Sequence, residues 1–258
     1  MIDYKIVIPS YQRPQIFKDK TLALLKKYKI PIDNIDLLLG TPEEGQEYRK
    51  VLGNSFATNF IYHGQKGIGA VRNWIKWYYK YQTNVKYVVY LDDDITSILD
   101  WQTPIENFES FIENMFYETE TKELNLWGIS AFHNPFFMKK TITTNLKYIC
   151  GAFSGEIIDR TKHDIYCDVD HGEDFQFTCE YFLRDGGVLR NNGVCIVTKY
   201  FGDGGINASY GGLEERKKDM EVQCKYLNER YGSMTRLIEK KYGYDIRLNG
   251  FYKSNGPD

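Results

Sequence analysis

Apolar and polar positions alternate along the first hundred residues in a pattern that predicts strands and helices in turn. Short apolar runs rich in β-branched residues predict buried strands, and apolar residues spaced three and four apart predict the buried face of a helix. The expected strands cover residues 5–10, 35–40, 60–62 and 88–91, and the expected helices cover residues 14–28, a short stretch from about 42, and 68–79. We therefore expect an α/β fold of Rossmann-like type, with a mostly parallel central sheet flanked by helices.

The regular alternation stops after about residue 100. Expected helices cover residues 104–121, 174–184, 213–231 and 236–242; strand-like runs cover 126–132 and 146–153, and a hairpin over 188–197 turns at residues 191–193. We divide the chain into an α/β half, residues 1–100, a mixed α+β half of the same domain, residues 101–212, and a C-terminal helical extension, residues 213–258.

Composition narrows the functional classes. The 258 residues suit one large domain or one domain with an appendage, and the net charge of −2 gives no global signature of nucleic-acid binding. Five scattered cysteines without a CxxC pair are typical of reduced thiols and not of a zinc site. Neither a signal peptide nor a membrane-spanning stretch is found, so we expect a cytoplasmic protein with no membrane partner. The many aromatic residues, 21 of them tyrosine, suit stacking on sugars or bases as well as core packing.

The apolar run 88–91 ends in Asp92, Asp93 and Asp94. Three adjacent carboxylates repel one another, and a divalent cation such as Mg²⁺ or Mn²⁺ would compensate their charge. Ligands of open α/β sheets bind at the carboxyl ends of the strands, which is where these side chains are expected. The alternative is a solvated acidic turn. The apolar strand before the run favours a metal site.

Other candidate ligand-binding loops follow further expected strands. In residues 9–14, after the first strand, Tyr11 could stack on a base and Arg13 could meet a phosphate; a plain turn with a surface arginine is the alternative. Residues 63–73 carry glycines at a helix start, with Lys66 and Arg72 beside them, a pattern that suits an anion. Their spacing matches neither the Walker nor the dinucleotide fingerprint.

An acidic pair, Glu173 and Asp174, opens the helix expected at 174–184. Acidic residues stabilise a helix N-terminus, so capping is one interpretation. The other is a general base that removes a proton from an acceptor hydroxyl. Glycine-rich residues 151–155 and 202–205 are further loop candidates without an assigned role.

Taken in order, the segments IPSYQRP, GIGAVRNW, YLDDDI, CGAFSG and HGEDF resemble a nucleotide-sugar glycosyltransferase of the GT-A fold, in its family-2-like group. The resemblance spans most of residues 4 to about 200. Within that group the IPSY-x-RP opening and the DDD form are most similar to the TET-associated glycosyltransferases of bacteriophages. That narrower similarity implies transfer of a sugar onto 5-hydroxymethylcytosine in DNA, inside the host cytoplasm. Residues 1–100 would then bind the nucleotide sugar, and residues 101–212 the acceptor.

The resemblance also implies roles for single residues. The donor, a UDP-sugar such as UDP-glucose, would be bordered by Pro9, Tyr11, Arg13, Lys66, Gly67, Arg72, Asp92 and Asp93. Asp94, with Asp92, would bind the Mn²⁺ or Mg²⁺ that bridges the diphosphate. Asp174, beside Glu173, would be the base of an inverting reaction. No histidine follows His171 to complete the metal site. Asp203 or water would then supply the third ligand.

Two alternatives stay open. DDDIT also matches the motif of haloacid-dehalogenase-type phosphatases, with Asp92 as nucleophile, Asp94 as acid/base and Mg²⁺ as cofactor; that motif normally opens its domain, however, and here three strand–helix units precede it. The acceptor could also be a polysaccharide or a protein. For hydroxymethylated DNA, the expected phosphate-binding residues are Arg216, Lys217, Lys218, Lys225, Arg230, Arg236, Lys240 and Lys241, which alternate with acidic residues as on a solvated helix surface.

Overall fold

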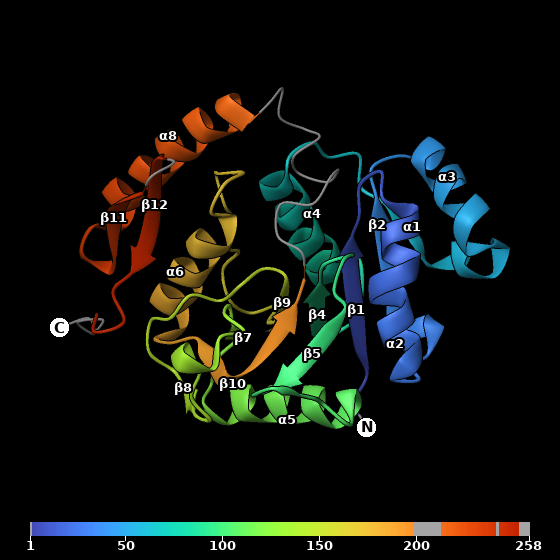
Figure 1. Ribbon diagram of the computed structural model, residues 1–258, viewed down its shortest axis with the longest axis horizontal. Helices are drawn as coiled ribbons and strands as arrows, with labels where there is room; N and C mark the ends of the chain where they lie inside the picture. Colours follow the sequence, from blue (N-terminus) through green and yellow to red (C-terminus); the bar gives the residue numbers. More distant parts are fainter. Residues whose placement is uncertain (1, 199–212, 241–242, 253–258) are drawn as a thin grey trace.

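A central sheet with helices on both faces organises the computed structural model, which describes residues 2–198, 213–240 and 243–252 (Figure 1). Its strand order is β3-β2-β1-β4-β9-β7-β10-β5-β6, and β8 pairs with β10. The strands are β1 (Tyr4–Pro9), β2 (Ile35–Leu39), β3 (Phe60–Tyr62), β4 (Tyr87–Leu91), β5 (Ser97–Asp100), β6 (Thr103–Pro104), β7 (Leu126–Ser130), β8 (Ile142–Thr143), β9 (Phe153–Ile157) and β10 (Leu189–Val197).

The first half forms the parallel sheet that the alternating pattern predicts. Strands β3, β2, β1 and β4 pair in parallel, and the chain order reverses between β1 and β4. Strand β9 then lies antiparallel between β4 and β7, while β10 continues parallel to β7 and antiparallel to β5. The carboxyl ends of β1, β4 and β7 therefore share one edge of the sheet.

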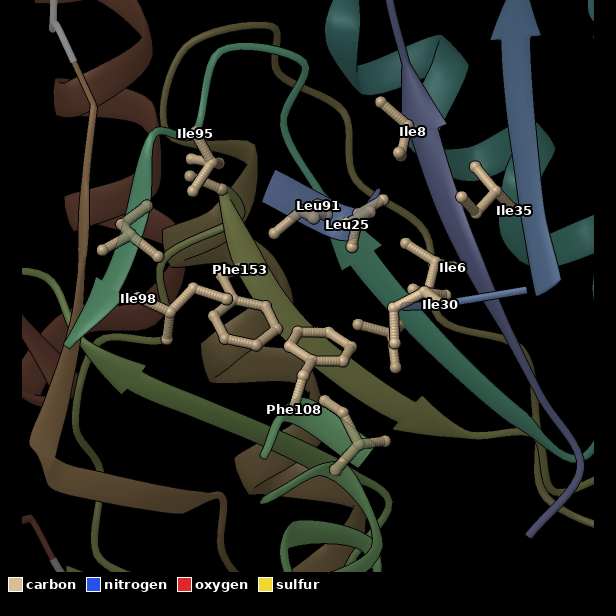
Figure 2. Close-up of a cluster of buried hydrophobic side chains, with 14 of the residues drawn as sticks. Ile6, Ile8, Leu25, Ile30, Ile35, Leu91, Ile95, Ile98, Phe108 and Phe153 are labelled. Carbon is tan, nitrogen blue, oxygen red and sulfur yellow. The ribbon is translucent and has the colours of Figure 1, made fainter. Parts of the chain in front are cut away.

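Helices cover both faces because alternate residues of a strand point to opposite sides. Ile6 and Ile8 of β1 pack with the helical segment α1 (Pro14–Phe17), its π-helical turn (Lys18–Leu22) and α2 (Ala23–Lys27), and with α5 (Phe108–Thr121), as Figure 2 shows in part. Val7 faces the other side and packs with α4 (Ile68–Tyr81). The remaining helix of this half, α3 (Pro42–Leu52), adds Tyr48 to the first cluster.

The C-terminal part contains one helix and a hairpin. Helix α8 (Leu213–Tyr231) and strands β11 (Thr235–Lys240) and β12 (Gly243–Leu248) pack against α6 (Glu173–Asp185), on the side of the molecule opposite α3 (Figure 1). The helix predicted at 236–242 is wrong over its described residues, because Thr235–Lys240 is an antiparallel strand that pairs with Gly243–Leu248. Within the described residues, no helix is long and apolar enough to cross a membrane.

Three other expectations are wrong in detail. The strand predicted at 146–153 is a loop, and β9 begins only at Phe153. The hairpin predicted at 188–197 is the single strand β10: Asn191 accepts the Gly193 amide and Asn192 donates to Thr141, which produces an irregularity in the strand instead of a turn. Helix α5 begins at Phe108 because the Asn107 side chain caps it, so residues 103–104 are free to pair with β5.

Gly155, in the centre of β9, is required by the packing of the sheet. A Cβ atom there would lie 2.2 Å from Cε2 of Trp127, a fully buried ring. We expect Gly155→Ala to lower the free energy of unfolding by about 2 kcal/mol, because the core cannot take the added volume. Urea denaturation measures the change. In the control variant Gly250→Ala, the nearest atoms lie at 3.6 Å; equal stability of the two variants would contradict the packing account.

Candidate active site

The turn after β4 directs three adjacent carboxylates into three different surroundings. The Asp92 amide donates to the Ala152 carbonyl (2.9 Å), which ties the turn to the start of β9. The Thr21 hydroxyl donates to the Asp92 carbonyl (2.7 Å) and accepts from the Ile95 amide (2.8 Å). Thr21 lies in the π-helical turn of the first helix, so this irregularity helps to fix the acidic turn.

Asp93 points into the protein and has no exposed surface. Arg13 donates to both of its oxygens, from Nε at 3.1 Å and from Nη2, and the Ser10 hydroxyl donates at 2.5 Å. Tyr48 completes the cluster by contacting the Ser10 hydroxyl (2.6 Å) and accepting from the Arg13 amide (3.0 Å). Burial raises the pKa of Asp93 to about 6, and the Arg13 charge opposes the increase.

The sequence predicts that Arg13 and Asp93 contact the nucleotide-sugar donor, whereas in the structure the two side chains contact each other. The guanidinium of Arg13 is occupied by Asp93, and its Nη1 reaches Asp94 only at 3.9 Å. We infer that both residues hold the loop after β1 against the acidic turn. Pro9 ends β1 at the same place, and Tyr11, 45% exposed, is the large side chain that this loop presents to solvent.

Asp92 faces Arg72, a buried residue of α4. The Arg72 Nη2 atom lies 3.3 Å from Asp92 Oδ1 and donates to the Gly151 carbonyl at 2.9 Å. The Asp92 side chain stays 38% exposed, whereas that of Arg72 is 8% exposed. Partial burial raises the pKa of Asp92 while Arg72 lowers it. The arrangement leaves one carboxylate open to solvent beside a fixed positive charge.

Asp94 turns toward the end of β10, where it accepts a hydrogen bond from the Thr198 hydroxyl at 2.7 Å. Its side chain is 14% exposed. Within residues 2–198, 213–240 and 243–252, no three metal-binding side chains come together. The proposed third ligand, Asp203, lies outside the described residues, as does the loop 202–205. Asp92 and Asp94 therefore remain the two candidate metal ligands.

The acidic pair at the start of α6 lies across from Arg72. Asp174 accepts from the Tyr148 hydroxyl and from the amides of Gly151 (3.2 Å) and Phe175 (3.0 Å). Burial, together with the charge of Asp174, raises the pKa of Glu173 to about 8. The pKa of Asp174 is also raised by burial, but its hydrogen-bond donors oppose the increase. Both carboxyl groups line one small open pocket together with Arg72 and Tyr90.

The glycine-rich start of α4 is filled by the protein itself. Asp170 accepts the Gly69 amide at 2.8 Å, at the position where the sequence predicted an anion. A Cβ atom at Gly67 would lie 2.4 Å from Asp170, and one at Gly69 would lie 2.3 Å from the Val169 carbonyl. These glycines are thus explained by the close approach of residues 169–170. Lys66 is exposed, so its side chain can reach a ligand from this loop.

Sequence reasoning missed Tyr148, Asp170 and Thr198. Each contacts a residue of the site from a loop distant in sequence. Tyr148 stacks on Phe175, with ring centroids 4.2 Å apart, which holds it over the helix start. Tyr148 and Thr198 lie in no spacing pattern, whereas Asp170 lies in the acidic stretch 168–174, which is the signal that could have found it.

Comparison with solved structures identifies the fold. The chain matches S. aureus TarS 1-349 in complex with UDP-GlcNAc (14% identity, TM-score 0.52), covering 88% of this chain and 67% of that one. It matches the mannosyltransferase PcManGT from Pyrobaculum calidifontis in complex with GDP-Man and Mn²⁺ (12% identity, TM-score 0.53), and the match covers 88% of this chain and 64% of that one. It also matches glucosyl-3-phosphoglycerate synthase from Mycobacterium tuberculosis in complex with Mn²⁺ and UDP-glucose (10% identity, TM-score 0.54), and the match covers 95% of this chain and 86% of that one.

These structures are nucleotide-sugar glycosyltransferases, and the predicted GT-A fold is confirmed. The likeness, at identities this low, shows the fold alone. The chain spans 66% of the length of TarS 1-349 and 40% of a longer TarS structure. No protein-family model matches the chain, and no curated protein matches it either.

The Asp93 cluster predicts a stability effect that is separable from ligand binding. We expect Asp93→Ala to lower the free energy of unfolding by about 3 kcal/mol at pH 7.5, because Arg13 is left without its buried partner. Urea denaturation measures the loss. The double variant Asp93→Ala/Arg13→Met should recover part of it, since no unpaired charge remains. Additive losses in the double variant would contradict the buried ion pair.

Proposed function

We propose that this chain is a metal-dependent glycosyltransferase that moves a sugar from a UDP-sugar to an acceptor hydroxyl. The observation that carries the proposal is the pair of partly exposed carboxylates, Asp92 and Asp94, at the end of β4 in a GT-A fold. This edge adjoins the point between β1 and β4 where the strand order reverses, which is where open α/β sheets bind nucleotides. The matched structures that contain UDP-GlcNAc, UDP-glucose or GDP-Man support the donor class.

The carboxylate ligands available at this edge of the sheet suit a hard divalent cation. Asp92 and Asp94 offer carboxylate oxygens, which Mg²⁺ and Mn²⁺ prefer, and such ions usually bind few protein ligands plus substrate phosphates. When bound, Mn²⁺ or Mg²⁺ would neutralise the diphosphate leaving group. Tyr11 would border the base, and Pro9 would shape the loop that carries it.

Asp174 is the base in this proposal. Two neighbouring carboxyl groups with unequal pKa values divide into one that keeps its proton and one that ionises. The pKa of about 8 keeps Glu173 protonated at pH 7, while hydrogen bonds from Tyr148 and Gly151 favour the ionised form of Asp174. Asp174 would then accept the proton of the acceptor hydroxyl as that oxygen attacks the sugar.

The acceptor that we propose is 5-hydroxymethylcytosine in DNA, with a polysaccharide or protein hydroxyl as the alternative. The basic surface expected on the C-terminal helices gives little support, since Arg230 pairs with Asp168 and Glu180, and Lys225 pairs with Glu221. The loop after β7 is more suitable: Phe132, Phe136 and Phe137 are all more than half exposed, and rings of this kind stack on bases and sugars.

The phosphatase alternative is disfavoured by the fold. Asp92 would have to act as a nucleophile, yet it lies beside Arg72 at the end of the fourth strand along the chain, in a sheet that matches glycosyltransferases. No observation in the described residues favours that reaction over sugar transfer.

Donor binding tests the metal assignment. We expect UDP-glucose with Mn²⁺ to raise the melting temperature of the protein and to release UDP slowly. Asp94→Asn should weaken UDP-glucose binding about tenfold or more, because a charged contact worth about 1.5–3 kcal/mol is lost. Calorimetric titration with and without Mn²⁺ measures the change. The control is Asp100→Asn, an exposed carboxylate at the end of β5; an unchanged Kd in Asp94→Asn would refute the assignment.

The base assignment predicts opposite behaviour of two neighbouring variants. Asp174→Asn should keep UDP-glucose binding and lower kcat about 10²- to 10⁴-fold, because no group accepts the proton. Glu173→Gln should keep transfer within a few fold at pH 7, since glutamine resembles the protonated glutamate.

The assay follows labelled glucose from UDP-glucose to a hydroxymethylated oligonucleotide, with the unmodified oligonucleotide and free sugars as controls. Transfer retained in Asp174→Asn but lost in Glu173→Gln would assign the base to Glu173. Transfer to free sugars but not to hydroxymethylated DNA would reject the DNA acceptor.

A further inference from the structure

A positively charged cluster gathers around Asn192, near the start of β10. The Lys147 ammonium donates to Asn192 Oδ1 at 3.3 Å, and the Lys139 amide donates to the Asn192 carbonyl at 3.1 Å. Arg190 lies two residues before Asn192 and donates to the Ser130 hydroxyl at 3.4 Å, at the end of β7. Pairing between β8 and β10 fixes these segments relative to one another.

The two segments that carry this cluster contain no acidic residue. Residues 124–155 contain Lys139, Lys140 and Lys147 but neither aspartate nor glutamate, and residues 186–198 contain Arg190 and likewise no acid. The Nε atom of Arg190 is buried and has no hydrogen-bond partner among the described residues. Buried guanidinium groups are normally paired, because an unsatisfied donor of this kind is costly.

The charges around Lys147 and Arg190 also favour binding of an anion. Burial lowers the pKa of Lys147, and the positive charges of Arg190 and Lys139 lower it further. Burial also lowers the pKa of Arg190, against a small opposing effect of Cys150 and Tyr148. Positive groups that repel one another and lack a carboxylate are arranged to meet an external anion.

The cluster adjoins the proposed base. Arg190 lies within electrostatic range of the Tyr148 hydroxyl, and Tyr148 donates to Asp174. Lys147 directly precedes Tyr148 in the chain, and Gly151 of the same loop donates to Asp174 and accepts from Arg72. An anion held by the cluster would therefore lie beside the loop whose residues Tyr148 and Gly151 donate to Asp174.

We propose that Arg190, Lys147 and Lys139 bind a phosphate group of the acceptor and so orient its hydroxyl toward Asp174. That the phosphate belongs to the acceptor rests on the proposed glycosyltransferase function, whereas the phosphate site itself rests on the charged cluster. A guanidinium can bind phosphate through two parallel hydrogen bonds. The Nε–H of Arg190 has no partner among the described residues and is one donor of such a pair. The lysines add charge at the rim.

The experiment measures binding of a labelled single-stranded oligonucleotide with one hydroxymethylcytosine by fluorescence anisotropy, in the full chain. A matched oligonucleotide carries uncharged methylphosphonate linkages beside the modified base, and glycerol phosphate and inorganic phosphate serve as competitors. Arg190→Gln and Lys147→Gln should each raise the Kd about tenfold and reduce the salt dependence by about one phosphate contact. Arg190→Lys should restore part of the affinity. The control Lys122→Gln, which pairs with Glu118 on α5, should bind as the wild type does.

Each result has one meaning. Stronger binding of the charged oligonucleotide, lost in the two glutamine variants, supports a phosphodiester acceptor; competition by glycerol phosphate without oligonucleotide binding supports a small phosphorylated acceptor. Equal Kd values for charged and uncharged probes, no binding of any probe by the wild type, or wild-type affinity in Arg190→Gln would overturn the proposal. The thermal shift caused by UDP-glucose and Mn²⁺ is followed in parallel. Its absence in the wild type would count against the glycosyltransferase function and not against the phosphate site.

Discussion

The buried ion pair between Arg13 and Asp93 is the interaction on which the rest of the site depends. Three consecutive carboxylates can follow a buried strand only if their charges are separated or compensated. The protein buries the middle one against Arg13 and Ser10. Because successive side chains diverge in this turn, Asp92 then faces Arg72 and Asp94 faces Thr198. The same pair ties the loop after β1 to the acidic turn at the end of β4.

Arg72 connects the two halves of the site. It contacts Asp92 at the end of β4 and the Gly151 carbonyl in the loop whose amide reaches Asp174. Its charge favours the ionised forms of the carboxylates on both sides, Asp92 and Asp174. Because Arg72 is held in place on α4, it does not need to reorient when a charge develops nearby. This geometry would allow one buried arginine to support both the proposed donor binding and the proposed proton removal.

Sequence patterns predicted the parallel half well because its elements are strongly periodic and local. They failed where tertiary contacts decide the structure: side-chain hydrogen bonds of Asn191 and Asn192 turned a predicted hairpin into one strand, and Asp170 filled the glycine-rich helix start. The acidic run and the acidic pair were proposed as site residues from residue type alone. The different surroundings of Asp92, Asp93 and Asp94 could not be predicted in this way. They depend on Arg13, Arg72 and Thr198, which lie far away in sequence.

A crystal structure with UDP and Mn²⁺ tests the central claim most directly. The account predicts Mn²⁺ bonded to Asp94, with or without Asp92, and to the diphosphate, with the uracil beside Tyr11 and Asp93 still buried against Arg13. UDP bound elsewhere on the molecule, or a metal ion bonded to Asp93 after loss of the Arg13 contact, would contradict it.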